Sequence, residues 1–205
     1  MKAMAIVLTA VFCLALPARG QDTAAVKKDA GGYRMPEPLT GNAFCKWMVG
    51  EWQGTGTSRL GKTKEWQKIE WALDNQFLLL HATSKITEMS SEQMDAAASA
   101  MKMSKEDIQK MKEMEYKGMG PLTVDPATGD FTGYWFDNWR GVYKGTGKLE
   151  GTKITMTWQG AMGSEVRTFE KLGEDKMVVT FAEHSPDGTT MEGRAEYARA
   201  RSTHK

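Results

Sequence analysis

The chain has 205 residues, of which 40% are hydrophobic and 26% are charged, a composition that suits one globular domain with a single core. The formal net charge is +1 at neutral pH, and no run of basic residues concentrates positive charge. A nucleic-acid-binding function is therefore not expected, because phosphate binding needs a concentrated basic surface.

Residues 1–20 have the pattern of a secretory signal peptide. Lys2 precedes an uncharged run that ends at Pro17, and the small residues Ala18 and Gly20 stand before an expected cleavage site at Gln21. The run is too short for a stable membrane span, so we expect no stable membrane anchor after cleavage. An uncleaved anchor is the alternative. The short basic and apolar segments are typical of bacteria and predict a periplasmic or secreted protein.

Cleavage would leave Cys45 as the one cysteine of the mature chain, which excludes an internal disulfide. The mature chain would carry 25 basic and 26 acidic residues. Glycine, proline and polar residues predict a flexible linker over residues 21–40, followed by one domain over residues 41–200.

A short helix is expected first in the domain. Asn42 can cap a segment that carries Phe44, Trp47 and Met48 and ends before Gly50. We expect this helix to plug one end of a barrel.

After this helix the pattern becomes β. Apolar and polar residues alternate, as in Ile154, Met156 and Trp158, and turn residues such as Asp125–Asp130 and Ser185–Gly188 separate the runs. The pattern predicts an all-β fold, an antiparallel up-and-down barrel that closes on itself. Ten strands are expected, at about 51–60, 64–73, 76–87, 116–125, 130–138, 141–149, 152–160, 164–172, 175–183 and 188–199.

One segment, residues 90–115, interrupts the β pattern. Ser90 with Gln93, and Ser104 with Asp107, have the spacing of helix-starting capping boxes. We predict an inserted helix pair whose methionine-rich apolar faces cover the open end of the barrel. The apolar faces are Met94, Ala97 and Met101 in the first helix and Ile108, Met111 and Met114 in the second.

Several motifs resemble those of a known fold family. Gly50-Glu-Trp52 after a short helix resembles the Gly-x-Trp signature of lipocalins and their calycin relatives. A longer set of motifs resembles a bacterial family of small, often secreted lipocalin-like domains without an assigned function. These are Gly50–Gly56, Leu73–Phe77, Gly118–Gly120, Asp125–Gly129, Phe131–Trp135 and Gly145–Gly147.

The resemblance also implies a structural role for the last strand. In lipocalin-like folds an arginine of that strand lies over the signature tryptophan, which here is Trp52. Arg199 is the expected partner, with Arg194 and Arg201 as alternatives. Gly50, Trp52 and Arg199 would then close the floor of the barrel.

Aromatic and apolar residues at inward positions predict a binding cavity for a small apolar or amphipathic molecule, with the helix pair as its lid. The alternative is an envelope interaction protein that docks a partner through the methionine-rich insertion. The expected cavity lining is Trp71, Trp135, Met156, Trp158, Phe181 and Tyr197.

No pattern indicates an enzyme, a metal site or a bound cofactor. No Gly-x-Ser-x-Gly elbow is present, and the three histidines, His81, His184 and His204, lack the spacing of a zinc site. Asp137 and Glu165 are a carboxylate pair that can meet inside a barrel. The opening motif also resembles that of nitrobindins, which carry haem on a histidine near their last strands. This makes a haem protein the less favoured alternative, with His184 the nearest substitute for that ligand.

Overall fold

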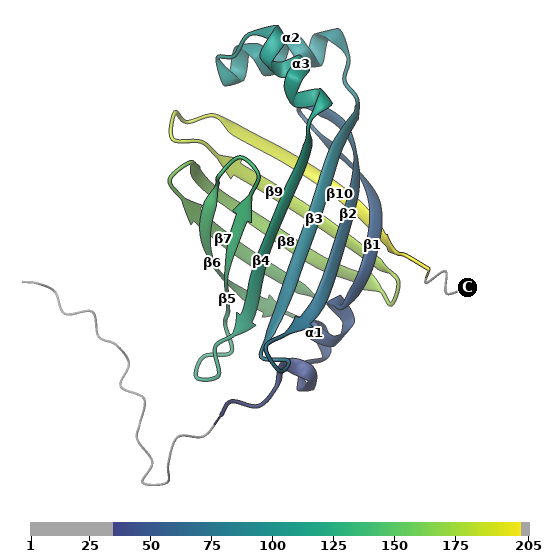
Figure 1. Cartoon of the computed structure of the whole chain (residues 1–205), viewed down its shortest axis with the longest axis vertical. Helices are drawn as coiled ribbons and strands as arrows, with labels where there is room; N and C mark the ends of the chain where they lie inside the picture. The colour runs from purple at the N-terminus through teal and green to yellow at the C-terminus, as the bar shows by residue number, and fades with distance from the viewer. Residues whose placement is uncertain (1–34, 202–205) are drawn as a thin grey trace, which may run out of the picture. The chain divides into compact units, whose positions relative to one another are not determined.

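The computed structural model describes residues 35–201, and a closed antiparallel barrel of ten strands forms most of this part (Figure 1). Each strand pairs with its sequence neighbours, and β1 pairs with β10 to close the sheet. The predicted fold class is confirmed, with strand ends that shift by up to three residues. The strands are β1 (Gly50–Ser58), β2 (Gly61–Ala72), β3 (Phe77–Glu88), β4 (Glu115–Val124), β5 (Phe131–Asp137), β6 (Val142–Glu150), β7 (Lys153–Gly160), β8 (Gly163–Gly173), β9 (Lys176–His184) and β10 (Thr190–Arg199).

The predicted first helix, α1 (Ala43–Met48), lies at one end of the barrel, hereafter the floor end. The Asn42 side chain accepts hydrogen bonds from the backbone N–H groups of Phe44 and Cys45, which satisfies donors that a helix start leaves free. The helix buries Phe44, Trp47 and Met48 in the main core. A 3-10 turn (Leu39–Gly41) precedes it, and the core also contains Leu39, although the sequence pattern assigned that residue to the linker.

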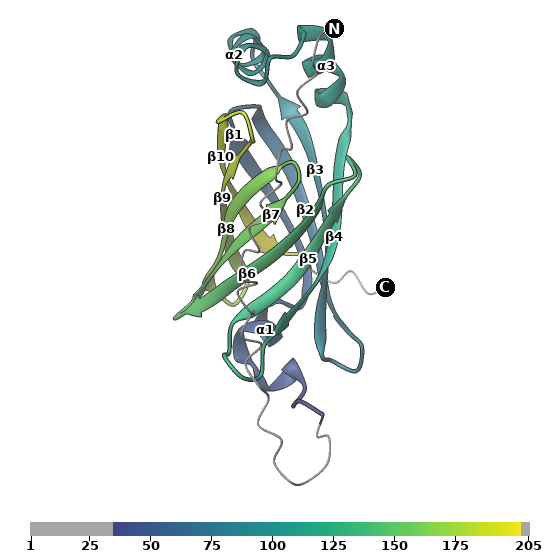
Figure 2. The ribbon, with the colours of Figure 1, turned by 90° about the vertical axis from the view of Figure 1, so that its left-hand side faces the viewer.

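The other two helices, α2 (Ser91–Met101) and α3 (Lys105–Glu113), lie at the opposite end of the barrel, the helix-pair end (Figure 2). Ser90 and Gln93 form the predicted reciprocal capping box, and Ser104 accepts from the N–H of Asp107. Lys102 has φ +53° and ends α2 in the left-handed conformation. Local sequence signals thus determine where both helices begin.

A second, smaller core holds the helix pair against the barrel rim. Ala97 of α2 and Ile108 of α3 are fully buried. Leu60, Ile86 and Met191, which belong to the rim, pack with them. The helix methionines in this small core are Met94, Met101 and Met111, while Met114 is exposed.

Residues 1–34 and 202–205, which include the expected signal peptide and most of the expected linker, lie outside the described residues. Between residues 35 and 201, no helix has the length and apolarity that a membrane span needs.

Candidate functional site: the barrel interior

All six residues predicted to line the barrel are on its inner face. Trp71, Met156, Trp158 and Tyr197 belong to the main core or pack against it. Met156 is fully buried and Tyr197 is 6% exposed, so both contribute to packing of the main core. Trp135 and Phe181 are only half-buried. The predicted lining therefore ranges from the fully buried Met156 to the half-buried Trp71, Trp135 and Phe181, and Trp135 also packs against the main core.

Aromatic rings lie flat on the barrel wall because glycines occupy the facing positions of the neighbouring strands. A Cβ atom added to Gly145 would lie 2.3 Å from the ring of Trp158, and one added to Gly118 would lie 2.3 Å from the ring of Trp135. Gly193 has the same relation to Phe181. These distances are far below van der Waals contact, so glycine is needed at each position. The rings present their faces to the interior.

A partly buried ion pair lies inside the barrel among these rings. Arg167 donates from Nε and Nη2 to the two carboxylate oxygens of Glu165, at 2.7 and 2.8 Å. The guanidinium also lies 5.5 Å from the centroid of the Phe181 ring. Burial disfavours the charged form of Arg167, but the adjacent Glu165 outweighs this effect and raises the arginine pKa. The side chains of Arg167 and Glu165 remain 23% and 17% exposed.

Two tyrosines face this ion pair from other strands. Tyr116 of β4 accepts a hydrogen bond from Nε1 of Trp135 at 2.7 Å. Burial raises the pKa of Tyr116 to about 12, although the positive charge of Arg167 acts in the opposite direction. Burial likewise raises the pKa of Tyr143 in β6, and Asp137, Glu183 and Glu165 add to that shift. Side chains from β4, β6 and β8 therefore interact across the interior.

Carboxylates outnumber basic groups in this region. Burial raises the pKa of Glu183, and the negative charges of Glu165 and Asp137 raise it further, whereas Arg167 lowers it. Asp137 also accepts from the N–H groups of Trp139 and Gly141 and so shapes the turn between β5 and β6. We call the six interacting residues the inner polar cluster: Tyr116, Asp137, Tyr143, Glu165, Arg167 and Glu183.

A hydrogen-bonded relay lies next to this cluster. Nε2 of Gln67 donates to the hydroxyl of Tyr197 at 2.9 Å, and that hydroxyl donates to Glu65 at 3.4 Å. Ser84 donates to the other oxygen of Glu65 at 2.7 Å. Gln67 is 4% exposed, and its Oε1 has no hydrogen-bond partner within residues 35–201. This buried acceptor is therefore left unsatisfied by the protein itself.

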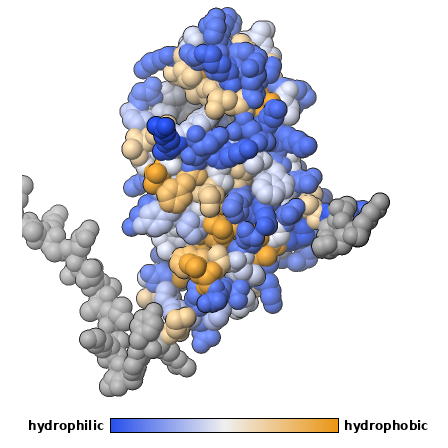
Figure 3. Space-filling model, viewed as in Figure 1, coloured by the Kyte–Doolittle hydropathy of each residue, from blue (hydrophilic) through white to orange (hydrophobic). Residues whose placement is uncertain are grey.

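The surface is hollowed below the helix pair (Figure 3). The members of the inner polar cluster lie toward the strand ends at this side, where β4 starts and β5 and β9 end. Their partial exposure is consistent with solvent access from this end.

The floor end is closed by different contacts. Cζ of Arg199 lies 4.2 Å from the centroid of the Trp52 ring, and the guanidinium donates to the carbonyls of Val49 and Trp47, each at 2.7 Å. Gly50 has φ +136°, and a Cβ there would lie 2.6 Å from Nη1 of Arg199. A larger residue at Gly50 would displace the arginine.

Neither of the two described histidines, His81 and His184, faces the interior. The apolar run Phe77–His81 would allow an inward His81, but alternation along β3 turns Leu78 and Leu80 inward and His81 outward, where its Nε2 lies 3.5 Å from Glu70. His184 is exposed and lies 3.1 Å from the hydroxyl of Thr190. The haem alternative therefore has no inward histidine among the described residues. Cys45 is fully buried, and burial raises its thiol pKa to about 12.

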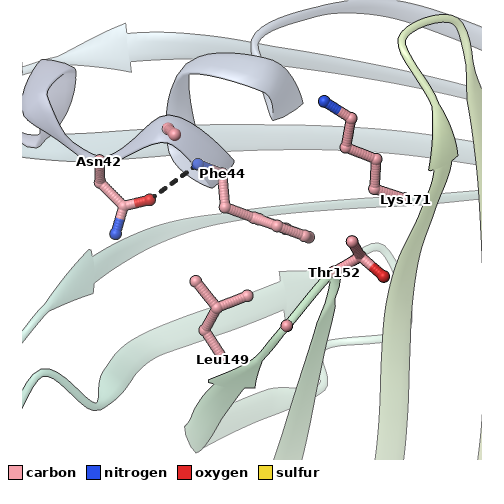
Figure 4. Close-up of a pocket in the computed structure, with 7 residues that line it drawn as sticks. Asn42, Phe44, Leu149, Thr152 and Lys171 are labelled. Carbon is pink, nitrogen blue, oxygen red and sulfur yellow. Dashed lines mark hydrogen bonds between the residues drawn. The ribbon is translucent and has the colours of Figure 1, made fainter.

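Two clefts on the outer surface do not contain the predicted lining residues. One, of about 390 Å³, lies beside α1, where Asn42, Phe44 and Lys171 face Leu149 and Thr152 (Figure 4). The other, of about 440 Å³, lies where β3 leads into α2, between Lys62 and Gln93. Within residues 35–201, no group of three or more His, Cys, Asp or Glu side chains is placed to hold a metal ion.

Sequence reasoning noticed Asp137 and Glu165 but not Arg167, Glu183 or Gln67. Alternation could have indicated them, since Arg167 has the same parity as the buried Phe169 and Glu183 has that of Val179. These residues were overlooked because polar side chains are not expected at inward positions, although the register of the closed barrel places them there.

The sequence matches no protein-family model and no curated protein. The fold is similar to that of an S-type phycobiliprotein lyase, CPES, from Guillardia theta, with a TM-score of 0.52 and 9% identity over 83% of this chain and 96% of that protein. A crystal structure of a DUF3598-family protein of unknown function from Nostoc punctiforme PCC 73102 aligns with a TM-score of 0.26 and 8% identity, over 77% of this chain and 98% of that protein. The first similarity supports the lipocalin-like barrel at the level of fold.

Proposed function

We propose that the protein is an exported lipocalin-like carrier or receptor that holds one small amphipathic molecule in the half of the barrel below the helix pair. The observation that carries this proposal is the inner polar cluster, with its Glu165–Arg167 pair 17% and 23% exposed inside a closed barrel. Burying charges costs free energy, so a barrel that needed only stability would be expected to fill this space with apolar side chains.

The arrangement of apolar and polar groups supports an amphipathic occupant. The flat rings of Trp135, Trp158 and Phe181 offer apolar surface, and the cluster offers hydrogen-bonding groups beside them. Binding sites for small molecules commonly combine such a lining with a few placed polar groups. The similar fold of a phycobiliprotein lyase is compatible with this proposal but supplies no residue-level support at 9% identity.

The helix pair is better explained as a lid than as a docking surface. Met94, Met101 and Met111 pack into the small core at the rim, so most of the insertion's apolar surface is already covered by this chain. Thr189 donates to the carbonyl of Ala100, and Lys102 lies 3.5 Å from Asp187, so α2 is attached to the hairpin between β9 and β10. Opening these few contacts would widen access to the interior.

Native mass spectrometry of the protein purified from its own envelope fraction tests the proposal. We expect an extra mass that denaturation releases. Ala82 faces inward beside Gln67, so Ala82→Phe should exclude the occupant, whereas Thr83→Phe adds the same ring on the outer wall and should retain it. Apo protein that also fails to take up 2-naphthylmethanol, a small neutral aromatic alcohol, would contradict the proposal.

A further inference from the structure

The interior offers many more hydrogen-bond acceptors than donors. Within the inner polar cluster, three carboxylates, those of Asp137, Glu165 and Glu183, accompany one guanidinium, that of Arg167, and Glu65 of the Gln67 relay is a fourth inward carboxylate. Glu165 occupies Nε and Nη2 of Arg167 in a bidentate pair. The remaining carboxylates therefore have no basic residue of their own within the cluster. An anionic occupant would meet this excess negative charge.

The unpaired Oε1 of Gln67 is a second, independent indication that the interior lacks hydrogen-bond donors. Glu65 accepts from both Ser84 and Tyr197, so the Tyr197 proton points toward Glu65. Tyr197 must then accept from Nε2 of Gln67, which fixes the amide orientation and leaves Oε1 free. A buried acceptor without a partner costs free energy, and a hydrogen-bond donor on an occupant would remove that cost.

The Gln67 relay and the inner polar cluster both face the interior of the barrel. Arg167 and Tyr197 are close enough for the guanidinium charge to lower the Tyr197 pKa, against the larger raising effect of burial. Around them, the faces of Trp135, Trp158 and Phe181 cover the wall. Aromatic faces attract cations as well as apolar groups, so the wall suits a positively charged nitrogen attached to a ring or a short chain.

From these observations we infer that the occupant is a cationic amphiphile: a primary or secondary ammonium group on an apolar body. This inference rests on the proposed function and adds the chemical class of the ligand. The ammonium donates to Oε1 of Gln67 and lies among the inward carboxylates, of which Glu65, Asp137 and Glu183 form no ion pair within residues 35–201. The apolar body lies against the aromatic wall.

Three probes with the same ring system and different charge test the inference by isothermal titration calorimetry on the full mature chain. They are 2-naphthylmethylamine (cationic), 2-naphthylmethanol (neutral) and 2-naphthoate (anionic). We expect the amine to bind at least tenfold more tightly than the alcohol and the naphthoate to bind most weakly. Added salt should weaken binding of the amine and leave binding of the alcohol almost unchanged.

A matched pair of variants locates the effect. Glu183→Gln keeps the shape of the side chain. It should weaken binding of the amine about tenfold without changing the affinity for the alcohol. Glu192→Gln removes the same charge from the outer face of β10, where Glu192 is exposed, and should change neither the affinity for the amine nor that for the alcohol. A thermal melt of each variant confirms that it is folded.

The outcomes separate the two proposals. An alcohol or naphthoate that binds as tightly as the amine, or an amine that is insensitive to Glu183→Gln, overturns the ammonium inference and leaves the carrier proposal standing. Failure of all three probes to bind overturns the ammonium inference, and it overturns the carrier proposal as well when native mass spectrometry also finds no extra mass.

Discussion

The two ends of this barrel are built on opposite principles. At the floor end, α1 and the Trp52–Arg199 pair fill the interior, and side chains such as Met48 and Ile154 have no exposed surface. At the helix-pair end, inward positions carry Glu, Asp, Arg and Tyr, and several remain partly exposed. The floor end therefore contributes most of the stability. In the other half, polar groups occupy inward positions that apolar side chains would fill in a core selected for stability alone.

The largest expected effect concerns the floor. Trp52 is fully buried, its Nε1 donates to the carbonyl of Met48, and its ring contacts Trp47. Trp52→Ala should lower the free energy of unfolding by about 3–5 kcal/mol, measured by urea denaturation. Trp135→Ala, in the half-buried wall of the other end, should cost clearly less. Equal costs would contradict the distinction between the two ends.

The closure by Arg199 should have the next largest effect on stability. Arg199→Met removes the contact with Trp52 and the hydrogen bonds to Val49 and Trp47, and should cost about 1–3 kcal/mol. Arg194→Met, on the exposed outer face of the same strand, should stay within about 0.5 kcal/mol of the wild type. A cost for Arg199→Met as small as that of Arg194→Met would show that the closure adds little.

The polar half should make stability depend on pH. Because the folded protein raises the pKa of Glu183 above its unfolded value, the stabilisation from this group is complete below the unfolded pKa and is lost as pH rises through the folded pKa. Glu183→Gln should therefore be more stable than the wild type at pH 7, and this gain should disappear by about pH 4. Thermal melts across this range check the prediction, and a gain that is the same at every pH would contradict it.

The smallest effect on global stability is expected at the lid. Thr189→Val removes the hydrogen bond to Ala100 and should change the free energy of unfolding by less than about 1 kcal/mol. Hydrogen exchange of α2 should nevertheless become faster, while exchange in α1 stays unchanged. Faster exchange throughout the barrel would instead mean that the tether supports the whole fold.

The sequence predicts the fold better than it predicts the site, for a physical reason. Alternation, turn residues and the caps at Asn42 and Ser90 are local signals, and they predicted ten strands and three helices. The inner polar cluster joins β4, β5, β6, β8 and β9 through the closure of the barrel, which no local pattern encodes. Inward charged residues such as Arg167 and Glu183 also break the apolar alternation that marks a core. Strand parity could have indicated each of them, but the register was needed to show that they meet.

The most direct test of a binding site in the polar half of the barrel is a two-dimensional NMR titration with the neutral probe 2-naphthylmethanol. Its readout is the indole N–H signals, since tryptophans lie at both ends of the barrel. We expect shifts for Trp135 and Trp158, in the wall of the helix-pair half, and none for Trp47 and Trp52 at the floor. Shifts at Trp47 and Trp52 alone, or no shifts at all, would contradict a binding site in the polar half of the barrel.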